Sequence, residues 1–402
     1  MAGPLLGIRV LDLTQGVAGP YATKLLSDYG ADVVKIERPD GGDPTRRVGP
    51  FPDDVPHLDR SGLFFELNSG KRSVTLNLAT ATGRRILQRF AADADLVIES
   101  FRPGTLARLG LNAERLEAIN AAAALVQLSN YGQDGPYLDF EMDDLGAYAM
   151  GGVLALTGGE GREPARIGLY APLFLAGGVL ATYTIGAVFG SRRTGRGERV
   201  DASLFEILAS SMDRGGPNLV AYQYSGSLMT TRSASQVRNA MPNGVFRCTD
   251  GYVSITGLTN FFPRMARMID RPDLAEDAAF LARIEDPEFL PEVEPLLTDW
   301  LSTRTKREAM ERGQAEGLPV SALNTMEDVF NDPHLRERAF FETVEQPAAG
   351  DVVMPGLPLR MSDTPGEVRP APTLGEHTSE VLTEALGYSM QDITVLRQRG
   401  VV

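Results

Sequence analysis

In Gly7–Pro39 the sequence reads GIRVLDLTQGVAGPYATKLLSDYGADVVKIERP, a pattern typical of one strand, loop, helix and strand. The apolar run over residues 8–13 predicts a short buried strand. Residues 21–29 repeat apolar side chains at helical spacing, and residues 32–36 form a second, β-branched run. Two strands joined in this way are parallel, with a right-handed crossover. We therefore expect a ligand at the carboxyl ends of the strands, over Thr14–Ala18.

A unit of this kind is also typical of dinucleotide-binding domains, which form the first alternative. The loop QGVAGP (Gln15–Pro20) does not have the Gly-x-Gly-x-x-Gly spacing that lets a backbone approach a pyrophosphate. Glu37 lies near the position of the acidic residue that binds a ribose, but Arg38 puts a positive charge directly beside it. The missing glycine pattern argues against an NAD site.

Length and charge limit the class of protein. The 402 residues exceed what one core usually organises, so we expect two domains. The formal net charge is −14, from 39 basic and 53 acidic residues, whereas binding to nucleic acid or an anionic membrane requires a basic face. No apolar run is expected to approach the roughly 20 residues that span a bilayer, and the N-terminus lacks the charged and apolar regions of a signal peptide. A cytoplasmic protein without a membrane or nucleic-acid partner is predicted.

Cysteine and histidine do not indicate a metal or a nucleophile. Cys248 is the single cysteine, and we interpret it as a buried structural thiol. The three histidines, His57, His334 and His377, are too scattered for a paired metal motif. Neither metal catalysis nor a serine-histidine triad is therefore predicted.

Strands and helices continue to alternate beyond the first unit. Residues 64–78 have the pattern of a turn and a strand, residues 81–92 that of an amphipathic helix, and residues 95–100 and 125–129 those of two further strands. This alternation predicts the α/β class with a mostly parallel, Rossmann-like sheet.

Several short motifs then follow one another along the chain, each weak alone. They are Asn68-x-x-Lys71-Arg72-Ser73, Glu99-Ser-Phe-Arg-Pro-Gly104, Ser129-x-x-Gly-Gln-x-Gly-Pro136, Arg192-x-Thr-Gly-Arg-Gly197 and Asp332-Pro-His-Leu-Arg336. In their order the chain resembles the class III CoA-transferases, which include formyl-CoA, carnitine and aryl-succinate CoA-transferases and the α-methylacyl-CoA racemases. The resemblance implies a large α/β domain from residues 1–225 and 326–402, a small α+β domain at 226–325, and an interlocked dimer.

The resemblance implies that coenzyme A or an acyl-CoA binds as substrate, with no covalently bound cofactor. Because coenzyme A carries a pyrophosphate and a 3′-phosphate, an acidic protein must gather cations where these groups lie. Lys35, Arg38, Arg46 and Arg47 predict such a cluster, and the glycine-rich residues 157–162 offer either a phosphate cradle or a flexible turn. The positions that match the family's CoA groove are Gln15, Val17, Ala18, Arg38, Leu76, Ser100, Phe101 and Arg108.

The family's catalytic group is an aspartate that attacks the acyl-CoA thioester and forms a mixed anhydride. Counted back from Thr194-Gly-Arg-Gly197, its position falls on Leu173, or on Phe174 if the helix is shifted by one residue. No acidic residue lies between Glu163 and Glu198. The resemblance therefore implies a chain that has no catalytic residue of this type.

The racemase branch of the family requires a histidine and an aspartate that exchange a proton. The histidine position is Asp143 here, and the aspartate position is again apolar. Asp143 is a candidate lone base, although acidic loop residues are mostly solvated. The family's glycine-rich flap corresponds to Arg238–Gly244, which contains one glycine.

Three functions follow. The leading one is a non-catalytic subunit of a heteromeric CoA-transferase, whose paralogous partner supplies the aspartate and whose leading substrate class is aryl-succinates. The second is an active homodimer that uses Asp143, Asp144 or Glu141 for transfer, racemisation or isomerisation of an acyl-CoA. The third is a CoA-ester binding protein without a partner.

Overall fold

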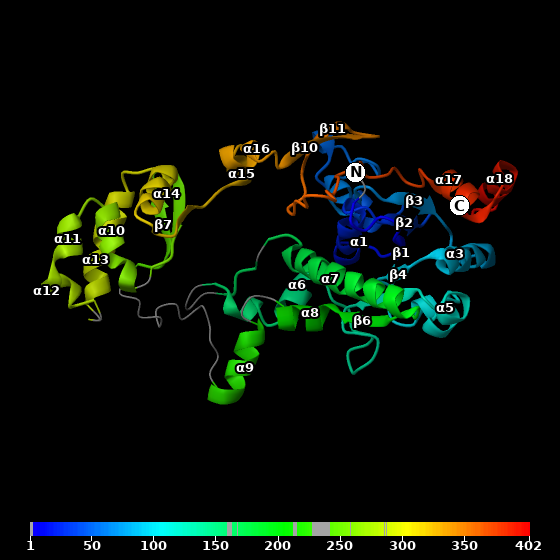
Figure 1. The fold of residues 1–402 in the computed structure, drawn as a ribbon, viewed down its shortest axis with the longest axis horizontal. Helices are drawn as coiled ribbons and strands as arrows, with labels where there is room; N and C mark the ends of the chain where they lie inside the picture. The colour runs from blue at the N-terminus through cyan, green and yellow to red at the C-terminus, as the bar shows by residue number, and fades with distance from the viewer. Residues whose placement is uncertain are drawn as a thin grey trace. The chain divides into compact units, whose positions relative to one another are not determined.

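The computed structural model describes residues 3–158, 163–166, 168–211, 215–226, 242–257, 259–284, 286 and 288–402 (Figure 1). The chain forms two compact units. The large unit comprises Met1–Thr231 and Ala339–Val402, and the small unit is the intervening segment Arg232–Arg338. The large unit is thus built from two separate parts of the chain.

A six-stranded parallel sheet forms the centre of the large unit, in the order β3-β2-β1-β4-β5-β6. The strands are β1 (Arg9–Leu13), β2 (Asp32–Glu37), β3 (Arg72–Thr75), β4 (Leu96–Glu99), β5 (Ala124–Ser129) and β6 (Arg199–Ser203). This topology confirms the predicted α/β class with a Rossmann-like parallel sheet. The strand order reverses between β1 and β4, and the carboxyl ends at such a point form a crevice for ligands.

Helices cover both faces of the sheet because the side chains of each strand alternate between them. Val10 of β1 packs in the core on the α1 and α7 face, whereas Leu11 and Leu13 pack on the opposite face. The helices of the first face are α1 (Ala18–Asp28) and α7 (Ala171–Thr194), and those of the second are α3 (Ala81–Asp93), α5 (Ala113–Ile119), α17 (Thr378–Leu386) and α18 (Met390–Gln398) (Figure 1). Two separate cores result.

Helix α1 begins three residues before the predicted start at Tyr21. Pro20 falls in the first turn, where its missing N–H leaves no intrahelical bond unmade. The helix therefore takes in residues that the apolar spacing alone had left in the loop.

Helix α7 has 24 residues and is long and apolar enough to cross a membrane by length and composition. The prediction that no apolar run approaches the length of a membrane span is therefore wrong. In the fold, α7 connects β5 to β6 and packs against α1, where a Cβ atom on Gly177 would lie 2.6 Å from the Ala18 carbonyl oxygen. A crossover helix of a parallel sheet accounts for its apolar sequence.

The remaining elements of the large unit lie in its connections. They are η1 (Pro44–Arg47), η2 (Pro52–Asp54), α2 (Gly62–Asn68), α4 (Thr105–Arg108), α6 (Asp144–Met150), η3 (Leu154–Leu156), α8 (Leu204–Ser211), α9 (Gly215–Ser225) and the antiparallel pair β10 (Phe341–Gln346) and β11 (Gly350–Pro355).

The small unit combines an antiparallel sheet with helices. Its strands, in the order β7-β8-β9, are β7 (Gly244–Cys248), β8 (Gly251–Ile255) and β9 (Val320–Ala322). Its helices are η5 (Thr259–Phe261), α10 (Phe262–Met268), α11 (Pro272–Glu276), α12 (Ala278–Leu281), α13 (Phe289–Leu301), α14 (Lys306–Ala315), α15 (Met326–Phe330) and α16 (Pro333–Glu337). Phe262 and Phe289, fully buried, pack edge to face in its core.

Candidate functional site

A cavity of about 580 Å³ lies at the carboxyl edge of the central sheet. Four of the positions expected to line a CoA groove, Gln15, Arg38, Leu76 and Phe101, lie in its wall. They follow β1, β2, β3 and β4 respectively, so the parallel sheet brings them together from distant parts of the chain. The other lining residues are Leu13, Ile36, Glu37, Pro39, Asp40, Asn77, Leu78, Ala79, Leu109 and Gly400.

The loop between β1 and α1 forms one wall of this cavity. Gly16 has a φ of +78°, a left-handed conformation that glycine adopts without strain. The Gln15 N–H donates to Ser100 Oγ at 2.8 Å, which ties the loop to the end of β4 across the switch point. Val17 and Ala18 are buried at the start of α1 and do not line the cavity.

Arg38 is the exposed cation of the cavity wall. Its Nε and Nη2 donate to the two carboxylate oxygens of Asp40 at 2.9 and 2.6 Å, and this contact lowers the pKa of Asp40. Arg108 is also exposed, and its Nη2 donates to Thr105 Oγ1 at 2.7 Å. Arg108 does not line the cavity, although its neighbour Leu109 does.

The predicted cluster of four phosphate-binding cations is not present as such. Lys35 is fully buried and pairs with Asp43 at 2.9 Å. Arg46 is fully buried as well and pairs with Glu37 at 2.7 Å and with Asp59. The prediction that Lys35 and Arg46 bind phosphate is therefore wrong, because both side chains are buried and pair with carboxylates of the chain.

A third buried ion pair, between Lys71 and Asp12, lies near the loop between β1 and α1. Lys71 Nζ approaches Asp12 Oδ2 at 3.2 Å and donates to the Pro20 carbonyl and to Asn68 Oδ1, both at 2.9 Å. Burial lowers the pKa of Lys71 to about 8. Burial also opposes the charge of Asp12, but Lys71 and Lys35 outweigh it and lower the pKa of Asp12.

Phe101 lines both the main cavity and a smaller one of about 140 Å³. Its N–H donates to the buried Glu99, whose pKa is raised by burial and whose other oxygen accepts from Gln127. The smaller cavity is also lined by Ser100, Arg102, Pro103, Ser129, Asn130, Leu138, Asp139, Phe140 and Glu141. Two of the predicted groove residues, Ser100 and Phe101, thus line the same cavity as Asp139 and Glu141 of the loop after β5.

The candidate carboxylates of that loop have contacts of their own. Asp143 Oδ1 accepts from the Gly146 N–H at 2.7 Å, so Asp143 caps the start of α6. Glu141 forms an ion pair with Arg102, and both are exposed. Asp144 lies in the first turn of α6.

The start of α7 holds Leu173 and Phe174, the two positions that the sequence motifs matched to the family's aspartate. Leu173 packs against the core on the α1 face, and the ring of Phe174 meets the ring of Tyr21 edge to face at 4.8 Å. The first turn of α7 contains no acidic side chain. Apolar packing therefore occupies both positions.

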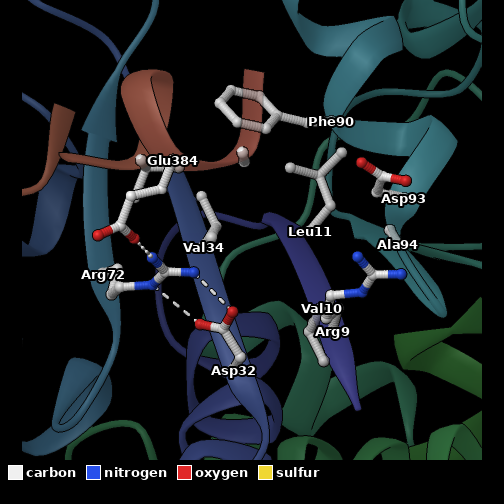
Figure 2. A pocket seen from close by; sticks show the side chains of 12 residues that line it. Arg9, Val10, Leu11, Asp32, Val34, Arg72, Phe90, Asp93, Ala94 and Glu384 are labelled. Atoms are coloured by element: carbon white, nitrogen blue, oxygen red, sulfur yellow. Dashed lines mark hydrogen bonds and ion pairs between the residues drawn. The ribbon is translucent and has the colours of Figure 1, made fainter. Parts of the chain in front are cut away.

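A further cavity, of about 260 Å³, lies at the amino edge of the sheet. Figure 2 shows Arg72 directed at Asp32 and Glu384, with distances of 2.5 Å and 3.9 Å between the charged atoms. Arg9, Asp32 and Arg72 are the first residues of β1, β2 and β3, so this cavity opens at the opposite edge from the strand ends. None of the predicted groove positions lines it.

Other candidate groups are placed as follows. Among the residues that the structure describes, no three His, Cys, Asp or Glu side chains form a group that could hold a metal. Cys248 is buried, and burial raises the pKa of its thiol. The predicted phosphate cradle at 157–162 and the flap segment at 238–244 lie largely outside the described residues.

The fold and this site define an α/β protein with its ligand cavity at the switch point of a parallel sheet. A family model described as CoA-transferase family III matches residues 5–378. The chain therefore belongs to CoA-transferase family III, as the resemblance predicted.

Two curated relatives cover nearly the whole chain. It is 35% identical to the "Succinyl-CoA--L-malate CoA-transferase alpha subunit" of Chloroflexus aurantiacus, over 99% of this chain and 92% of that protein. It is also 35% identical to the beta subunit of the same name from that organism, over 99% of this chain and 98% of that protein. Among solved structures, a CAIB/BAIF family protein from Brucella suis matches with a TM-score of 0.80 and 29% identity, covering 96% of this chain and all of that one.

Sequence reasoning missed Asp12 and Asp43, which hold the loop at the cavity. A signal was present for Asp12, because a charged residue stands inside the apolar run of β1, as Lys35 does inside β2. A charge within a strand that is buried on both faces requires a partner nearby. Asp43 lies in a Gly-Gly-Asp-Pro turn, which gave no indication of burial.

Proposed function

We propose that this chain binds coenzyme A in the 580 Å³ cavity as one subunit of a CoA-transferase. The single observation that carries the proposal is the convergence of Gln15, Arg38, Leu76 and Phe101 on one cavity at the switch point. Ser100 supports the same site through its bond to Gln15. Val17, Ala18 and Arg108 remain predicted contacts, and CoA or acyl-CoA is the substrate rather than a resident cofactor.

The catalytic carboxylate of the assembly is proposed to come from a paralogous partner chain. In the family mechanism a carboxylate attacks the thioester and expels CoA thiolate, which then attacks the resulting anhydride. This attack at the enzyme's carbonyl releases the donor acid and leaves the enzyme carboxyl as a CoA thioester. The acceptor carboxylate then attacks that thioester and expels CoA thiolate. The thiolate attacks the acceptor carbonyl of the new anhydride, which gives the acceptor's CoA thioester and the free enzyme carboxylate. Leucine or phenylalanine cannot form an anhydride, so Leu173 or Phe174 makes this chain the non-catalytic half.

An interlocked dimer with that partner is part of the proposal. Tyr183 and Phe189 of α7 are 68% and 62% exposed, and Tyr224 of α9 is 88% exposed. Large apolar side chains at this density on two helices are typical of an interface. The two relatives named alpha and beta subunits support a heteromer. A homodimer would bury the same apolar side chains of α7 and α9.

For the substrates we propose succinyl-CoA as the CoA donor, because both curated relatives bear that name. Their printed acceptor is L-malate, whereas the sequence resemblance favoured aryl-succinates. The aryl-succinate acceptor stays a prediction, and a dicarboxylic acid is the chemistry that the two acceptors share.

The test starts with native mass spectrometry of the assembly purified from its native host. We expect a complex with a second chain of similar mass, which exchanges CoA between succinyl-CoA and L-malate or an aryl-succinate. Replacing the partner's aligned aspartate with alanine should abolish exchange. An active assembly that contains this chain alone would overturn the non-catalytic role.

The smaller cavity favours one alternative, an active enzyme that uses a different carboxylate. Glu141 lines it beside Ser100 and Phe101, whereas Asp143 is engaged as a helix cap. If this chain is active alone, Glu141→Gln should abolish turnover while Asp144→Asn leaves it intact. Tight acyl-CoA binding by an isolated homodimer with no exchange would instead indicate a CoA-ester binding protein.

A further inference from the structure

We infer that the buried Lys35–Asp43 ion pair is a positioning device for the loop Thr14–Ala18, which must hold its shape for coenzyme A to bind. The inference rests on the proposed CoA site. Lys35 Nζ donates to the Thr14 carbonyl at 2.8 Å and pairs with Asp43 Oδ2 at 2.9 Å. Both side chains are completely buried, so the pair acts from beneath the loop and not as a ligand contact.

Asp43 also bonds to the loop at Gly16. Its Oδ1 accepts from the Gly16 N–H at 3.4 Å, and from the N–H and Oγ1 of Thr45 at 2.9 and 2.7 Å. The two bonds to Thr45 fix the carboxylate at the start of η1. One ion pair therefore contacts the loop on both sides of Gln15, the residue that faces the cavity.

Two further side chains complete the enclosure of the loop backbone. Asp12 Oδ1 accepts from the Thr14 N–H at 2.9 Å, and Ser100 Oγ accepts from the Gln15 N–H at 2.8 Å. Three successive amide groups and the Thr14 carbonyl thus each bond to a side chain. The partners are Asp12 of β1, Lys35 of β2, Asp43 before η1, and Ser100, which directly follows β4. The loop has little freedom while these contacts are intact.

Stability alone is a weak reason for this arrangement. Replacing a buried ion pair by apolar groups of similar size is often neutral or stabilising, because desolvation offsets the attraction of the charges. A role in positioning predicts a different signature, in which ligand binding falls more than folding stability does. That separation is what an experiment can measure.

The experiment compares two double variants of the full chain, each in the assembly that it forms. Lys35→Met with Asp43→Asn removes the donor to Thr14 and both charges, and keeps an acceptor oxygen for Thr45. The control, Arg72→Met with Asp32→Asn, removes an ion pair of the same sheet at its amino edge. CoA affinity is measured by isothermal titration calorimetry, and stability by the melting temperature.

We expect the first variant to bind CoA at least about tenfold more weakly, while the control binds like the wild type. Both should melt at similar temperatures. Hydrogen exchange of the Gln15 and Gly16 amides should accelerate in the first variant only, with no ligand present. Unchanged CoA affinity and unchanged exchange in the first variant would overturn the inference.

If the double variant fails to fold, Lys35→Gln with Asp43→Asn addresses the same point, because it keeps a polar side chain at each position and leaves no buried charge unpaired. Wild-type affinity in that variant would also overturn the inference. A different result, no CoA binding by the wild-type assembly, would overturn the proposed function. In that case the positioning role fails with it, since no ligand would depend on the loop.

Discussion

Arg38 and Asp40 form a two-point contact within the cavity wall, so a phosphate that binds Arg38 must compete with Asp40. We expect Asp40→Asn to tighten CoA binding about threefold at low salt, and less at high salt, because exposed charges are screened. The matched control is Asp273→Asn, since Asp273 accepts from Arg271 at the same spacing and distances in the small unit. Equal or weaker CoA binding by Asp40→Asn would contradict a phosphate contact at Arg38.

Lys71 gives a pH dependence whose sign is fixed. Its pKa is lowered from 10.5 to about 8 by burial and by the positive charge of Lys35, against the carboxylates of Asp12 and Asp43. The folded chain therefore loses this proton before the unfolded chain does, and the group's contribution to the free energy of unfolding rises from pH 8 to pH 10. Urea unfolding should show the advantage of wild type over Lys71→Met growing across this range.

The control for that measurement is Lys24→Met. Burial opposes the charge of Lys24, but Asp28 outweighs it and raises the pKa of Lys24 above 10.5. The difference between wild type and Lys24→Met should therefore stay level between pH 8 and pH 10. A level difference for Lys71→Met as well would mean that Lys71 keeps its ordinary pKa.

At the scale of elements, the contact between α1 and α7 depends on Gly177. An added Cβ would lie 2.6 Å from the Ala18 carbonyl oxygen, whereas one at Gly178 meets nothing within 4 Å. Gly177→Ala should reduce the free energy of unfolding by about 1–3 kcal/mol through overpacking. Gly178→Ala should be neutral or stabilise by about 0.5–1 kcal/mol. Similar melting temperatures for the two variants would contradict this close packing.

The sequence was informative about elements that have a strong local pattern. Apolar runs located β1 and β2, and the alternation of elements predicted the parallel sheet. The start of α1 was missed because proline is tolerated in a first turn. The membrane length of α7 was missed because glycine, threonine and tyrosine interrupt its most apolar residues.

The candidate site was predictable only in part. Motif matching placed Arg38 and Phe101 in one cavity, although they are far apart in the chain. Charge alone could not separate Arg38, which is exposed, from Lys35 and Arg46, which are buried with partners. For Lys35 the direction of its side chain on β2 decides the outcome, and strand register is set by pairings that a single strand does not reveal. Arg38 follows β2 and Arg46 lies in η1, so their outcomes depend on how the connecting segment folds back.

At the scale of the whole molecule, the exposed face of α7 bears on assembly. Replacing Tyr183 and Phe189 with glutamate should put charges into the proposed interface and dissociate the assembly into single chains. Native mass spectrometry measures this directly. Leu6→Glu with Met326→Glu is the control, because these side chains are also largely exposed but lie on other elements. An intact assembly in the α7 variant would exclude this face from the interface.

Arg46 is one of the residues that join the first part of the large unit to the part formed by Ala339–Val402. Its Nη2 donates to the Pro372 carbonyl at 3.2 Å, and the Asn77 N–H donates to the Val401 carbonyl at 2.7 Å. Helices α17 and α18 supply Val381, Leu382, Ile393 and Leu396 to one core. A ribosome makes these residues only after the whole small unit, so until then α3 and α5 alone cover that face of the sheet and part of it stays exposed. Exposed apolar surface of this kind promotes aggregation, and chaperones that bind nascent chains would protect it during translation.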